Sequence, residues 1–89
     1  MSTPSPDRRA LEDHWRQRLK DAELQLTFAR QRLAEVQRDF LSGKIHGAEG
    51  SVAYPRAVKA EGFALAEYTR VLQVFTDLVM DGKIPDEDD

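Results

Sequence analysis

Apolar residues recur at helical spacing through two long stretches of the chain. In the first stretch they alternate at intervals of four and three residues, which is the spacing of a helix packed along one face. This set comprises Trp15, Leu19, Ala22, Leu26, Ala29, Leu33, Val36 and Phe40. Charged residues fall mainly on the opposite side, so we predict an amphipathic helix from about residue 6 to residue 42.

The second stretch, residues 54–81, has an apolar face that is wider than one neighbouring helix covers. Two rows of residues run side by side along it. The first row is Tyr54, Val58, Glu61, Leu65, Tyr68, Leu72, Phe75 and Val79. The second row is Ala53, Ala57, Ala60, Ala64, Val71 and Leu78. We predict a second helix over residues 54–81 whose first row packs inside a hairpin and whose second row meets another chain. The other interpretation, that both rows pack against one partner, stays open.

A two-helix hairpin does not enclose a core of its own, and a chain this short commonly needs disulfides, metal or association. We therefore expect an all-α protein: an antiparallel helical hairpin that forms a homodimer, as a four-helix bundle, or a higher oligomer. Small side chains in the second row favour close approach of two backbones. The predicted dimer interface consists of Ala57, Ala60, Ala64, Val71 and Leu78.

The ends of both predicted helices carry recognisable signals. Pro6 and Asp7, after Ser5, suit a helix start. Gly43 and Gly82 each follow a predicted helix and precede Lys-Ile, which indicates left-handed glycine caps. We predict a glycine-rich loop over residues 43–53 and an acidic tail over residues 82–89, all within a single domain.

Composition narrows the function classes. The 89 residues carry a net charge of -3, and four negative charges lie in residues 86–89, so the remainder is almost neutral. That balance disfavours a nucleic-acid-binding protein. Cysteine is absent, which excludes disulfides and thiolate metal sites. No apolar run approaches the roughly 20 residues that span a membrane, and no signal-peptide core is present, so we expect a cytoplasmic protein without membrane attachment.

Glu61 is the one charged residue in the predicted first row. We expect it near Leu33, Val36 and Gln37, with Arg32 at the edge. A carboxylate there either makes a polar contact that fixes the helix register, or belongs to a metal site at an oligomer interface. His14 and His46 share no ligand spacing, and no serine or threonine has an activating neighbour. We therefore expect neither a cofactor nor enzymatic activity.

The favoured function is a non-enzymatic scaffold or protein-interaction module that associates with itself and with an unknown protein partner. Its candidate partner surface consists of Leu24, Phe28, Phe63 and Val74, which fall outside the main apolar faces. The alternative is an RNA- or DNA-binding regulator that uses a basic stripe on the first helix. That stripe consists of Arg9, Arg16, Lys20, Arg30 and Arg38, and Asp13 and Glu23 interrupt it.

Overall fold

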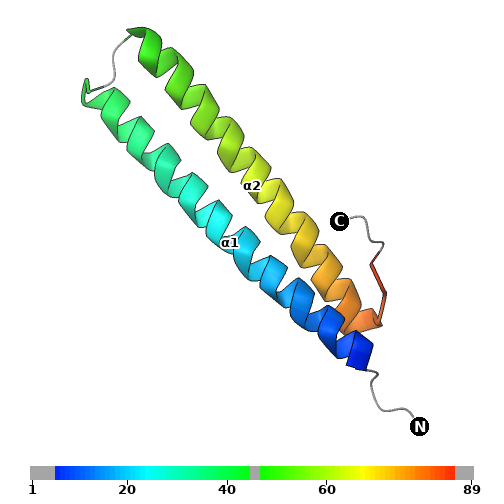
Figure 1. The fold of residues 1–89 in the computed structure, drawn as a ribbon. Helices are drawn as coiled ribbons and strands as arrows, with labels where there is room; N and C mark the ends of the chain where they lie inside the picture. The colour runs from blue at the N-terminus through cyan, green and yellow to red at the C-terminus, as the bar shows by residue number, and fades with distance from the viewer. Residues whose placement is uncertain (1–5, 45–46, 86–89) are drawn as a thin grey trace.

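Two long helices, α1 (Pro6–Leu41) and α2 (Gly47–Asp81), make up the fold. The computed structural model describes residues 6–44 and 47–85; His46 and the acidic residues 86–89 lie outside the described residues. The helices run antiparallel and side by side, so that the start of α1 and the end of α2 lie at the same end of the molecule (Figure 1). The result is a rod of 66 × 17 × 16 Å. The predicted all-α hairpin is confirmed.

The second helix begins earlier than predicted. α2 starts at Gly47, inside the segment expected to be a loop, and Pro55 lies within the helix rather than near its start. Glycine lowers helix stability by about 1 kcal/mol without forbidding the conformation, and proline removes one backbone donor. A helix that is supported by packing tolerates both. The connection between the helices is short as a result, as is usual for antiparallel neighbours.

The predicted glycine caps are confirmed at both helix ends. Gly43 has φ 81° and Gly82 has φ 67°, both in the left-handed region. Beyond α1, the backbone N–H of Lys44 donates to the carbonyl of Asp39 at 2.8 Å. At the end of α2, the N–H of Gly82 donates to the carbonyl of Leu78 at 3.0 Å. These bonds satisfy carbonyls that have no partner within the helix.

Replacing either cap glycine with alanine is expected to destabilise the hairpin, and Gly82→Ala more than Gly43→Ala. Both changes place a residue that has a Cβ atom in the left-handed backbone conformation, which costs about 1 kcal/mol. At Gly82 the new Cβ would also lie 3.2 Å from Nη1 of Arg8, whereas at Gly43 it would meet nothing within 4 Å. We expect a loss of about 2 kcal/mol for Gly82→Ala, measured by urea unfolding. Equal losses for the two variants would show that the Arg8 contact carries no weight.

A narrow core runs between the two helices. Toward the end of the rod where α1 begins and α2 ends, Trp15 and Ala22 of α1 form one cluster with Val71 and Leu78 of α2. The buried apolar side chains of the described residues are Trp15, Ala22, Leu26, Val36, Ala57, Val71 and Leu78. Several larger residues border this core and keep part of their surface in water. The core is therefore a single line of contacts with two open sides.

Candidate interaction surfaces

The face of α2 that packs against α1, its seam, contains some residues of each of the two predicted rows. Its buried and half-buried residues are Ala57, Glu61, Ala64, Tyr68, Val71, Phe75 and Leu78. Three residues expected at a dimer interface, Ala57, Val71 and Leu78, are thus buried against α1, with exposed fractions of 5%, 0% and 0%. Ala64 is half-buried and Ala60 is exposed. The predicted assignment of the two rows is corrected accordingly.

Glu61 explains this rotation of α2. Its carboxylate lies at the edge of the seam, where Nε of Arg30 is 3.3 Å from Oε2, and its side chain is half-buried. With the predicted first row facing inward, the carboxylate would lie in the middle of an apolar contact, which is costly. The expected neighbour Arg32 pairs instead with Glu35 at 3.8 Å within α1. The helices are therefore packed in a different register from the predicted one.

The metal site considered for Glu61 belongs to an oligomer interface, and one hairpin does not supply such a site on its own. Among the residues that the structure describes, no three histidine, cysteine, aspartate or glutamate side chains are grouped closely enough to hold a metal ion. His14 lies on α1 with its ring edge-on to Trp15, at 5.7 Å between ring centroids. Glu61 thus acts within one hairpin as an ion-pair partner of Arg30.

Four large residues remain half in water on the other part of the predicted first row. Val58, Leu65, Leu72 and Val79 follow one another at intervals of seven residues, and 44%, 40%, 38% and 39% of their respective surfaces are exposed. We call these four residues the α2 stripe. Each projects on the side of the hairpin where Glu61 also lies, because residues three and four apart share a helix face. The stripe therefore extends over about six turns of α2.

Side chains of α1 line one edge of the α2 stripe. The Nε2 group of Gln37 donates to the hydroxyl of Tyr54 at 3.4 Å. The guanidinium of Arg16 lies over the ring of Phe75, 5.4 Å from its centroid. Together with the Arg30 ion pair, these contacts cover the junction between the helices. They leave the outer part of the stripe uncovered.

The opposite side of the hairpin carries a charged cluster centred on Glu67. Its carboxylate lies 2.9 Å from Nη2 of Arg70 and 3.4 Å from Nη2 of Arg18. The hydrogen bond from Arg70 is the largest cause of the lowered pKa of Glu67. Burial opposes it, while the charges of Arg70 and Arg18 and the hydrogen bond from Arg18 also lower the pKa. Arg18 also stacks over Trp15, at 4.7 Å from the ring centroid. This cluster ties α1 to α2 on the side away from the stripe.

Glu67→Gln is expected to lower stability at pH 7 and to have little effect near pH 3. A carboxylate with a lowered pKa stabilises the fold above its unfolded pKa, and this contribution is lost as the pH falls through the folded value. The side chain is largely exposed, so the effect is about 0.5 kcal/mol. Thermal unfolding of both proteins across this pH range measures it. A constant difference between them at pH 3 and pH 7 would exclude the charge as its cause.

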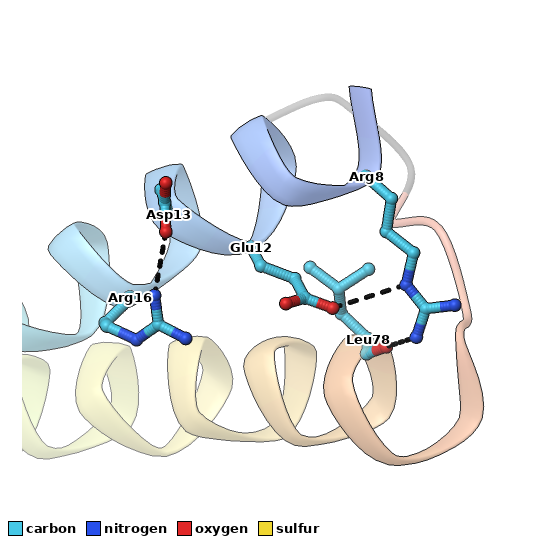
Figure 2. A network of polar contacts seen from close by, with 5 residues as sticks. All are labelled: Arg8, Glu12, Asp13, Arg16 and Leu78. Atoms are coloured by element: carbon cyan, nitrogen blue, oxygen red, sulfur yellow. Dashed lines mark hydrogen bonds and ion pairs between the residues drawn. The ribbon is translucent and has the colours of Figure 1, made fainter. Parts of the chain in front are cut away.

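Arg8 connects the start of α1 with the end of α2. Figure 2 shows its guanidinium between the first turn of α1 and the end of α2. Nη2 donates to the backbone carbonyl of Leu78 at 3.2 Å, while Nε pairs with Glu12 at 3.3 Å. A cation at a helix C-terminus is favoured by the helix dipole. This contact is structural and fixes the end of α2.

The basic stripe of the nucleic-acid alternative is interrupted in the structure. Nη1 of Arg16 pairs with Asp13 at 2.8 Å, as Figure 2 also shows, and Arg30 pairs with Glu61. These carboxylates neutralise two of the five cations that were expected to contact phosphates. The remaining members are Arg9, Lys20 and Arg38. The structure therefore provides no continuous positive surface along these residues.

The candidate partner surface is partly retained. Leu24, Phe28 and Phe63 are exposed, whereas Val74 packs against the core cluster and is only half-exposed. Because Arg30 contacts Glu61 and the helices are antiparallel, Phe28 and Phe63 lie at the same level along the rod. Phe28 is two residues before Arg30, and Phe63 is two residues after Glu61. Each ring therefore lies about 200° around its helix from the side chain that forms the ion pair. Both rings therefore point away from the side that carries the α2 stripe.

Comparisons with known proteins give no relative from which a role can be transferred. No family model, curated protein or solved structure matches this chain. Neither helix, over the part of the chain that the structure describes, is long and apolar enough to cross a membrane. The surfaces themselves therefore carry the argument about function.

Proposed function

We propose that this protein is a non-enzymatic helical scaffold that associates with itself through the α2 stripe. The observation that carries the proposal is the stripe itself: four large apolar residues at seven-residue intervals, each about 40% exposed in a single hairpin. A sustained seven-residue interval is typical of a helix that packs against another helix along its length. In the proposed dimer, two hairpins form a four-helix bundle.

The small core of the single hairpin supports the same proposal. Among the residues that the structure describes, one line of apolar contacts joins α1 to α2, and the buried set includes two alanines, Ala22 and Ala57. Short chains bury a limited fraction of their surface, so that association commonly supplies the missing stability. Each Å² of apolar stripe surface that a second copy covers stabilises the dimer by about 25 cal/mol. The residues that carry this gain are the stripe residues, in place of the second row predicted from the sequence.

The absolute mass in solution tests the proposal directly. Size-exclusion chromatography with light scattering is expected to give about 20 kDa, twice the chain's 10.1 kDa. The mass is expected to be equal at low and high salt, because apolar contact is not weakened by ionic screening. A stable 10 kDa species at high micromolar concentration would reject self-association.

The proposed scaffold binds a protein partner through Leu24, Phe28 and Phe63, on surfaces that point away from the stripe. The double variant Leu24→Glu, Phe28→Glu is expected to keep the dimer mass and to lose a partner that the natural protein captures. Both residues are exposed, so the change leaves the hairpin core intact. Chemical cross-linking followed by mass spectrometry measures the capture. Capture at the natural level by this variant would remove the patch from consideration.

A further inference from the structure

The exposed face of α2 has a packing seam of its own. Three small residues, Gly62, Thr69 and Thr76, stand between the four stripe residues, so the combined set alternates at intervals of four and three. All seven are exposed in the single hairpin. None is charged, although charged residues make up 33% of the chain. An uncharged surface packs against an identical copy without like-charge repulsion, which favours a second copy of this chain as the occupant.

Gly62 has no role inside the hairpin that requires a glycine. It lies in the middle of α2, and a Cβ added there would meet nothing within 4 Å. Glycine in a helix interior lowers stability relative to alanine. A side chain of a second chain that enters this space accounts for the absence of a side chain at Gly62. Gly62 is therefore a recess in the seam, next to the large side chains of Val58 and Leu65.

Thr69 presents an apolar surface at the centre of the seam. Its hydroxyl donates to the carbonyl of Leu65 in its own helix at 2.9 Å. The hydroxyl proton thus already has an acceptor, and burial of the side chain leaves no donor unsatisfied. Together, Gly62 and Thr69 make alternate layers of the seam small while the stripe makes the others large.

We infer that two copies pair through this seam with their α2 helices antiparallel, so that small residues of one copy lie opposite large residues of the other. This inference rests on the proposed function. A parallel pair in register places Gly62 opposite Gly62 and leaves a gap, and it places Leu65 opposite Leu65. An antiparallel pair allows each recess to receive a large side chain, which fills space more evenly.

Distances between two copies test the orientation. The chain has no cysteine, so Val58→Cys and Val79→Cys each introduce a single labelling site at an exposed position. With a nitroxide on either site, electron double resonance is expected to give about 25–40 Å between copies, from the helix rise of 1.5 Å per residue. Neither unlabelled variant is expected to form a disulfide-linked dimer on mild oxidation. Distances of about 10 Å, or efficient cross-linking at both sites, would show a parallel pair and overturn the inference.

A second variant tests the recess itself. Gly62→Leu fills it and is expected to abolish the dimer, although leucine favours the helix more than glycine does. The matched control is Ala66→Leu, which adds a similar volume on an exposed α2 position outside the seam and is expected to leave the dimer intact. A fully dimeric Gly62→Leu variant overturns the inference. A monomeric natural protein refutes the proposed function and this inference with it, whereas a dimer with short label distances refutes the inference alone.

Discussion

Leu65→Glu combined with Leu72→Glu is expected to leave the hairpin helical and to abolish self-association. Both leucines lie in the α2 stripe and keep 40% and 38% of their surface in water, so the isolated hairpin accommodates glutamate at either position. Glutamate and leucine also have similar helix propensities. In the proposed dimer, however, four carboxylates would enter an uncharged interface. Burying unpaired charge is costly enough that we expect a loss of at least about 4 kcal/mol, or a thousandfold in Kd.

Light scattering and circular dichroism on the same samples measure this outcome. The expected result is a mass near 10.1 kDa with the helical signal retained at low temperature. The double variant Leu24→Glu, Phe28→Glu is the matched control, because it makes the same chemical change on exposed residues away from the stripe. A dimeric Leu65→Glu, Leu72→Glu variant would show that self-association, if present, uses another surface.

The regular spacing of apolar residues is sufficient to predict the two helices, and the short segment between them predicts their antiparallel packing. The end of α1 is predicted to within a residue, and the glycine that follows each helix before Lys-Ile predicts the caps at Gly43 and Gly82. The start of α2 was not predictable in the same way. Glycine and proline mark weak helix positions, but the energy that overrides them comes from packing over a 35-residue helix. Pro55, next to the predicted start at residue 54, therefore indicates a later start than the structure shows.

The rotation of α2 could not be read from periodicity alone. Glu61, Tyr68 and Phe75 belong to two possible seams, one completed by Val71 and its row and the other by Leu72 and its row. Both seams alternate at four and three residues. In the structure the Val71 row faces α1, and Arg30 of α1 pairs with Glu61 at the edge of this seam. This partner lies on the other helix, 31 residues away, so it became visible only with the helix register.

The same limitation applies to the functional surfaces. Leu24 and Phe28 are recognisable because they break the polar face of α1, and Phe63 because it lies outside the main apolar face of α2. The α2 stripe was recognised as apolar but assigned to the inside of the hairpin. One signal in the sequence was available: the stripe and its neighbours Gly62 and Thr69 form a face without charge, whereas the flank of the Val71 row carries Glu67 and Arg70. An apolar surface of this length without a charged residue among its members is more typical of an interface with a second chain than of a hairpin edge.

Leu78→Ala is expected to destabilise the hairpin by about 3 kcal/mol, whereas Leu72→Ala costs the isolated hairpin less than about 1 kcal/mol. The two substitutions remove the same atoms. Leu78 is fully buried in the cluster with Trp15, so its loss leaves a cavity, while Leu72 is 38% exposed and water fills the space. In the proposed dimer Leu72 lies at the interface, and its truncation weakens association instead.

Urea unfolding followed by the fluorescence of Trp15, the only tryptophan, separates the two effects when it is repeated over a range of protein concentrations. The loss caused by Leu78→Ala is expected at every concentration, because it arises within one chain. The loss caused by Leu72→Ala is expected to grow as concentration rises and the natural protein gains stability from association. If Leu72→Ala were the more damaging change in dilute, monomeric protein, the Leu72 row would face α1. The surface proposed for self-association would then be the row of Val71 and Leu78.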